Sequence, residues 1–106
     1  MESNAPVLSD NQAESRFEIH VGGELAGSVV YRRSPEEQLI DLIHTEVDSR
    51  FEGQGLAGQL ARFALDTSRT EGIGVLPSCP YIRSWIKRHE DYLDLVPADR
   101  RADFGL

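Results

Sequence analysis

Hydrophobic and polar residues alternate with a period of two over the early part of the chain. Residues 16–21 follow this alternation strictly, as a half-buried strand does. Gly22-Gly23 can form a two-residue turn, after which the alternation resumes over residues 24–32, so the two segments predict a β-hairpin. Residues 38–47 begin with apolar side chains on both faces, which predicts a strand in the middle of a sheet.

The pattern then changes to a helical period. Apolar residues recur at spacings of three and four over residues 56–67, with charged residues on the opposite side, and Gly72 is placed to end this helix. Residues 73–76 predict a short buried strand. A second helical period over residues 82–89 predicts another amphipathic helix, and residues 92–96 form a closing apolar segment.

A strand, a helix and a further strand in this order predict two parallel strands, with the connecting loop at their carboxyl ends, where ligands bind in open α/β sheets. The sequence therefore predicts a mixed α/β (α+β) domain over residues 15–96, with a mostly antiparallel sheet, a splayed parallel pair and two main helices. Residues 1–14 are polar and aperiodic and predict a disordered leader, and residues 97–106 predict a flexible C-terminal tail. A chain of 106 residues can fold as one domain without disulfides or metal.

The net charge of -7 at pH 7 disfavours nucleic acid as a partner, because phosphate backbones are bound largely through excess lysine and arginine. The excess of acidic residues lies before Arg50, which either suits a cationic acceptor beside an anionic donor or serves solubility alone. The single cysteine excludes an internal disulfide, the histidines are too scattered to suggest a metal site, and nothing at the start reads as a signal sequence. The single cysteine and the lack of a signal sequence predict a protein of the reducing cytoplasm. No apolar run approaches the roughly 20 residues that cross a bilayer, so we expect no membrane partner.

The loop Arg50-x-x-Gly53-x-Gly55 joins the central strand to the first helix. Its glycines allow a tight turn and a close approach of the backbone to a ligand, and the helix that follows directs unpaired N–H groups and its positive dipole end to the same place. This geometry suits a phosphate or pyrophosphate. A turn without a ligand is the alternative, and Arg50 is either a phosphate contact or a solvated side chain.

Two candidate proton acceptors lie just before this loop. On the strand predicted over residues 38–47, His44 and Glu46 share one face with Ile40 and Leu42. An amine with a pKa of about 10.4 must lose a proton before it acts as a nucleophile, at a cost of roughly 4.6 kcal/mol at pH 7. Glu46 is the first candidate to accept that proton and His44 the second. A solvated carboxylate and a hydrogen-bonded packing histidine are the alternatives.

Cys79 lies between two prolines at the end of the last strand. Its thiol is a candidate nucleophile or pocket residue, and a small buried apolar side chain is the alternative. Arg83, Lys87 and Arg88 give the second helix a positive face, which either meets the outer phosphates of a donor or is simply solvated.

Four segments form a set of motifs in a fixed order. They are His44-Thr-Glu-Val47, Arg50-x-x-Gly53-x-Gly55-Leu-Ala, Pro77-Ser-Cys79-Pro-Tyr81-Ile and Trp85-Ile-x-x-His89-x-x-Tyr92. Together they resemble the GCN5-related N-acetyltransferases, the GNAT superfamily, and in particular a small stand-alone acetyltransferase-like branch. The resemblance covers residues 16–96.

The resemblance implies an N-acetyltransferase that moves an acetyl group from acetyl-CoA (coenzyme A) to an amine by direct attack in a ternary complex, without a metal. In this superfamily the strand before the loop contacts the pantetheine arm and the loop binds the pyrophosphate. Carried over by position, cofactor binding falls on Val47, Arg50, Phe51, Glu52, Gly53, Gln54, Gly55, Leu56 and Ala57, with Ser78 and Arg83 beside them. Catalytic roles fall on Glu46, His44 and Cys79, since this branch is similar in having a cysteine near the acetyl group. The acceptor would be a small molecule or a protein amine, and the protein a monomer or weak dimer.

Two departures from the larger GNAT enzymes are visible. The short Gly22-Gly23 turn leaves no room for the helices that build their acceptor site, and Trp85 and Ile86 stand near the point where many of them use a tyrosine as general acid. The alternative function is therefore a non-catalytic module that binds CoA or acyl-CoA, or an interaction domain.

Overall fold

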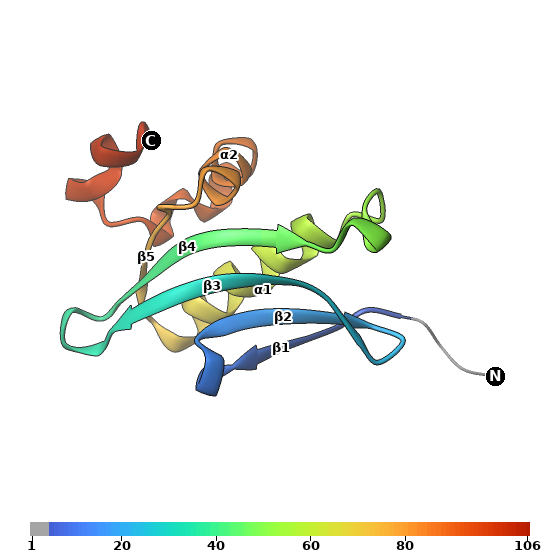
Figure 1. Ribbon diagram of the computed structural model, residues 1–106. Coiled ribbons are helices and arrows are strands. Elements are labelled where there is room, and N and C mark those ends of the chain that lie inside the picture. The colour runs from blue at the N-terminus through green and yellow to red at the C-terminus, as the bar shows by residue number, and fades with distance from the viewer. Residues whose placement is uncertain (1–4) are drawn as a thin grey trace.

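The computed structural model describes residues 5–106. A five-stranded sheet forms its centre, in the order β1-β2-β3-β4-β5. The strands are β1 (Val7–Asn11), β2 (Arg16–Val21), β3 (Glu24–Ser34), β4 (Leu39–Val47) and β5 (Gly74–Leu76). The first four pair antiparallel, and β5 runs parallel to β4 (Figure 1). The predicted fold class, a mixed α/β domain with a mostly antiparallel sheet and one parallel pair, is confirmed.

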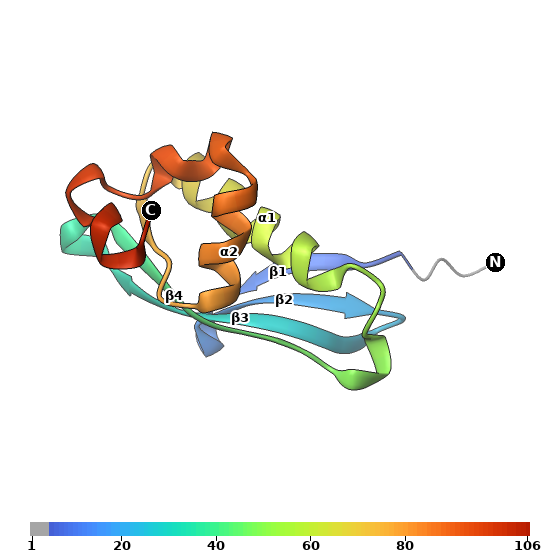
Figure 2. The same ribbon diagram turned by 90° about the horizontal axis from the view of Figure 1, so that it is seen from above.

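Two α-helices, α1 (Leu56–Glu71) and α2 (Pro80–Arg88), lie on one face of the sheet (Figure 2). Short 3₁₀ helices are η1 (Gln12–Glu14), η2 (Pro35–Glu37), η3 (Ser49–Phe51), η4 (Glu90–Leu95) and η5 (Ala98–Phe104). Gly72 ends α1 as expected, because its left-handed backbone (φ 71°) lets its N–H donate to the Arg69 carbonyl. No helix within residues 5–106 has the length and apolar character to span a bilayer.

The hydrophobic core lies between the sheet and these helices. Phe17, Val29 and Ile40 are fully buried on the sheet side, and Leu60 is fully buried on α1. β4 pairs with β3 on one side and β5 on the other, so the predicted central position of this strand is confirmed. The face of the sheet opposite the core carries no α-helix from the described part of the chain, and we call it the open face (Figure 2).

The N-terminal segment differs from the sequence prediction. Residues 1–14 were expected to form a disordered leader, but β1 pairs with β2 over its whole length and η1 follows it. The reason is tertiary: Leu8 packs against the core, and the Tyr31 hydroxyl donates a 2.6 Å hydrogen bond to Asp10. Polar residues with low strand propensity occupy much of this segment, so its local sequence pattern does not indicate a strand. Residues 1–4 lie outside the described part of the chain.

The C-terminal segment also differs. Residues 97–106 were expected to form a flexible tail, but most of them form η5, and Phe104 and Leu106 pack against the core. The Arg101 side chain donates to the Val96 carbonyl at 3.0 Å. The segment has few apolar residues and no period, so its sequence gave no sign of these long-range contacts.

Candidate functional site

A β-bulge interrupts β4 at the middle of the strand. Tyr31 of β3 pairs with Leu42, and the preceding residue Val30 pairs with His44, so Ile43 is an extra residue on β4. One extra residue reverses which side chains face each side of a sheet from that point on. The alternation assumed from the sequence therefore holds only up to Leu42.

The bulge corrects the expected placement of both candidate bases. His44 and Glu46 share a face with each other, as predicted, but not with Ile40 and Leu42. Both are exposed on the open face, where Glu46 pairs with Ser28. Thr45 and Val47 take the core-facing positions instead, and both are half-buried.

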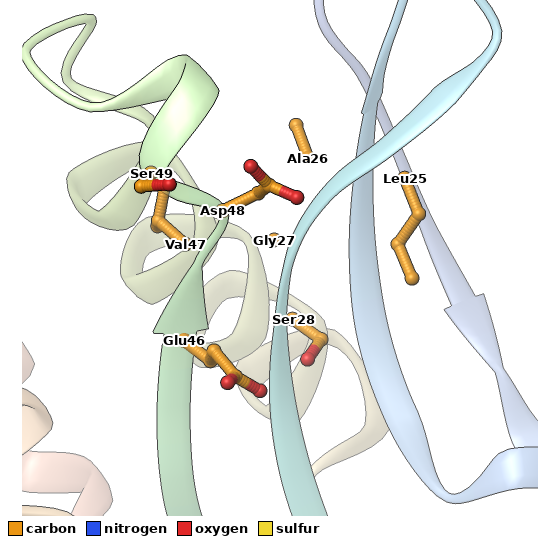
Figure 3. A pocket seen from close by; sticks show the side chains of 8 residues that line it. All are labelled: Leu25, Ala26, Gly27, Ser28, Glu46, Val47, Asp48 and Ser49. Carbon is orange, nitrogen blue, oxygen red and sulfur yellow. The ribbon is translucent and has the colours of Figure 1, made fainter.

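A cavity of about 410 Å³ lies on the open face where β4 ends beside the start of β3. Figure 3 shows Glu46 and Ser28 reaching into it side by side from β4 and β3. Ser28 is 8% exposed, so the cavity is lined by a buried hydroxyl group and by the Glu46 carboxylate. Asp48 lies at its rim and points toward Arg50 through a 3.2 Å salt bridge. Such a cavity suits a polar or cationic group.

β4 and β5 separate at the middle of β4. They pair at three positions, ending at Asp41 with Leu76, and the Cys79 N–H then donates to the Leu42 carbonyl at 2.8 Å. Beyond this bond β4 continues to Val47, whereas the chain after β5 turns into α2. The result is the splayed parallel pair that the sequence predicted, which opens toward the glycine loop.

Cys79 lies at the closed end of this splay. Its side chain is 3% exposed, and its Sγ lies 3.3 Å from the Thr45 Oγ1. The structure thus brings Cys79 together with Thr45, and places Glu46 and His44 on the other side of β4. Thr45 could not be selected from the sequence, because its core-facing orientation depends on the bulge.

Ser78 and Arg83 stabilise the turn before α2. The Arg83 side chain donates to the Pro77 carbonyl at 3.2 Å and to the Ser78 carbonyl at 3.0 Å. The guanidinium is therefore bound to the backbone carbonyls of this turn, and Arg83 is half-buried. A contact of Ser78 or Arg83 with a phosphate stays a prediction.

The glycine loop runs from η3 to the first residue of α1. Gly53 and Gly55 both have positive φ (80° and 72°), which glycine adopts without strain, and a Cβ at either position would meet nothing within 4 Å. Backbone conformation rather than crowding therefore explains why glycine occurs here. Among residues 5–106, no side chain caps α1, so the amides of its first turn are available to a ligand. The exposed loop residues are Glu52, Gly53, Gln54 and Gly55, and Phe51 is half-buried.

Arg50 is held at the start of this loop by two carboxylates. It forms salt bridges of 3.2 Å with Asp48 and with Glu24, and its side chain remains 61% exposed. The Arg50 side chain, together with the Arg50 backbone N–H, lowers the pKa of the Asp48 carboxyl. A phosphate would therefore have to compete with these two carboxylates for the Arg50 guanidinium. Within residues 5–106, no group of three His, Cys, Asp or Glu side chains is placed to hold a metal ion.

Comparison with known proteins agrees with this geometry. A family model described as GCN5-related N-acetyl-transferase matches residues 16–95. Protein NATD1 of Mus musculus is 28% identical over 90 residues, covering 84% of this chain and 82% of that protein. The solution structure of a GCN5-like protein from Staphylococcus aureus has a TM-score of 0.65 at 19% identity, covering 92% of this chain and 91% of that chain. The crystal structure of ribosomal-protein-alanine N-acetyltransferase from Brucella melitensis has a TM-score of 0.52 at 18% identity, covering 78% of this chain and 63% of that chain. The structural matches show the fold, the family match extends over most of the chain, and this chain therefore belongs to the GCN5-related N-acetyltransferase family.

Proposed function

We propose that this protein binds acetyl-CoA in the splay between β4 and β5 and transfers its acetyl group to an amine. The observation that carries the proposal is the separation of the two strands after the bond from Cys79 to the Leu42 carbonyl. The resulting opening has uncapped amides of α1 at one end and the Thr45–Cys79 contact at the other. A long donor with a phosphate group and a reactive thioester fits an opening with these two ends.

The donor would be held mainly by backbone groups. The loop from Phe51 to Ala57 offers N–H groups and the positive end of the α1 dipole to the pyrophosphate. The edge of β4 near Val47 faces the pantetheine arm, and Thr45 and Cys79 line the thioester end. Acetyl-CoA supplies an activated acetyl group, and the protein positions it.

The acceptor would approach from the open face. Glu46 is placed there beside the 410 Å³ cavity and would accept a proton from the amine, with His44 as the second candidate. The amine nitrogen forms a bond to the thioester carbonyl carbon, the carbon–sulfur bond breaks, and coenzyme A leaves as the thiolate. Direct attack is favoured over a route through Cys79, because the Cys79 side chain is 3% exposed and its Sγ lies against the Thr45 Oγ1 at the closed end of the splay.

Substitution of Gly55 by aspartate tests the loop. Aspartate tolerates a left-handed backbone, so the fold should survive, but its charge would repel a pyrophosphate, and we expect acetyl-CoA to bind at least about tenfold more weakly. Isothermal titration calorimetry measures the affinity. Gly55→Asn is the neutral control of equal size, and Gly72→Asp has the same backbone conformation at the far end of α1 and should bind normally. Equal binding by Gly55→Asp and the unsubstituted protein would mean that the loop is only a turn.

Substitution of Cys79 by alanine tests the chemical route. Direct attack predicts turnover within about threefold of the unsubstituted protein, because no bond to sulfur is formed. Amine acetylation is followed by mass spectrometry, which also detects any acetylated protein. Thr45→Val is a control that removes the hydroxyl beside the thiol with little change in volume. Loss of turnover in Cys79→Ala with retained acetyl-CoA binding would establish the covalent route. Binding without acetylation of any amine by the unsubstituted protein would leave the non-catalytic module as the function.

A further inference from the structure

A notch lies between α1 and α2 at Gly58, on the first turn of α1. A Cβ at Gly58 would lie 3.8 Å from the Trp85 Nε1 and 3.8 Å from the Tyr81 hydroxyl oxygen. The absence of a side chain therefore leaves a space into which two hydrogen-bond donors face. The notch belongs to a cavity of about 460 Å³ that also includes Gly55 and Arg62, so it is continuous with the glycine loop.

The Trp85 indole N–H lies at the wall of this cavity and has no protein acceptor in the described range. Trp85 is 3% exposed, and its N–H can only donate. No residue of the described range 5–106 accepts a hydrogen bond from it. Its ring is fixed by stacking on His89 at 3.7 Å and by the edge of Tyr92 at 5.1 Å. A donor held in one orientation at a cavity wall is preorganised to bind an acceptor oxygen of a ligand in that cavity.

The charges around the notch favour an anion. The uncapped first turn of α1 contributes free amides and the positive end of the helix dipole. The Arg62 guanidinium lies 5.3 Å from the Trp85 ring centroid and donates to the Tyr92 hydroxyl. The Asp66 carboxylate also lines the cavity, but it accepts a 2.7 Å hydrogen bond from the same hydroxyl.

We propose that a phosphate oxygen of the donor coenzyme occupies the Gly58 notch and accepts hydrogen bonds from the Trp85 indole N–H and the Tyr81 hydroxyl. This inference rests on the proposed function, and it adds two side-chain donors on α2 to the loop amides. Bound coenzyme would thus join α1 to α2 across the notch.

The chain contains one tryptophan, so its indole N–H gives a single assignable signal in a ¹H–¹⁵N correlation spectrum. We expect this signal to move when the nucleotide portion of coenzyme A, 3′-phosphoadenosine 5′-diphosphate, is added. Pantetheine alone should leave it in place. A shift with pantetheine and none with the nucleotide would overturn the assignment to phosphate.

Gly58→Ala separates binding from stability. The methyl group would sit at ordinary contact distance from both donors, and alanine favours a helix, so the melting temperature should rise. Because the methyl fills the notch, acetyl-CoA should bind about tenfold more weakly. Thr70→Ala, on the exposed side of the same helix, is the control that raises helix propensity without touching the notch.

Trp85→Phe and Tyr81→Phe remove one donor each and should each weaken binding by a smaller factor. Failure of the unsubstituted protein to bind acetyl-CoA would overturn the proposed function and this inference together. Normal binding with an unmoved indole signal, and with Gly58→Ala as tight as the unsubstituted protein, would overturn this inference alone.

Discussion

Replacing Ile40 with alanine is expected to lower the free energy of unfolding by about 2–5 kcal/mol. Ile40 is fully buried on the central strand β4, between Arg33 of β3 and Val75 of β5. Truncation removes buried methylene and methyl groups and leaves a cavity that the two neighbouring strands cannot close. Denaturation by urea, followed by circular dichroism, measures the loss.

Ile43→Ala is the matched control for this substitution. It removes the same atoms from the same strand, but Ile43 is the bulge residue and is 36% exposed. We expect its effect to stay below about 1 kcal/mol, because less apolar surface is buried there. Equal losses at the two positions would mean that β4 has no bulge and that Ile43 is buried in solution.

Gly27→Val is expected to lower the free energy of unfolding by about 1–3 kcal/mol through overpacking. A Cβ at this position would lie 2.8 Å from the Glu46 carbonyl oxygen and 3.2 Å from the Leu60 Cδ1. The first of these atoms belongs to the backbone of the adjacent strand, so relief requires β4 itself to move. Urea denaturation measures the stability, and the amide chemical shifts of Glu46 and Val47 report the movement.

Gly23→Ala separates crowding from backbone strain. Gly23 has φ of 81° in the β2–β3 turn, and a Cβ there would meet nothing within 4 Å. Alanine should cost about 1–2 kcal/mol from the left-handed backbone and leave the amide shifts at the end of β4 unchanged. If the amide chemical shifts of Glu46 and Val47 are also unchanged in Gly27→Val, then Gly27 is not needed for the close approach of β3 and β4.

Local patterns were sufficient to predict most of the fold. The alternation over residues 16–21 and the helical spacing from Leu56 onward report directly on which side of an element is buried, and Gly72 has the one backbone conformation that ends α1. The β1 strand was missed because Val7 is 63% exposed and the hydrogen bond of Asp10 reaches across the sheet to Tyr31. Contacts of that kind leave no periodic signal.

The candidate site was predictable only in part. The glycine loop could be located because a backbone with positive φ favours glycine, and its place between a strand and a helix could be read from the sequence. The bulge at Ile43 could not be predicted, because one inserted residue has no sequence signature. His44 and Glu46, which follow it on β4, were therefore assigned to the wrong face of the sheet. The indole N–H of Trp85 was not recognised as a ligand-binding group for another reason. Whether a donor lacks an acceptor depends on the positions of all neighbouring groups in the folded protein.

The strand order has a consequence for how the chain folds and flexes. Each of β1 to β4 lies beside its neighbour in the chain, so most pairings in the sheet are local in sequence, a low contact order that accompanies fast folding in small domains. β4 and β5 are joined only through the whole of α1. Within residues 5–106, the cleft between these two strands is thus the one strand boundary that no short turn closes. Its width can change while every antiparallel pairing stays intact.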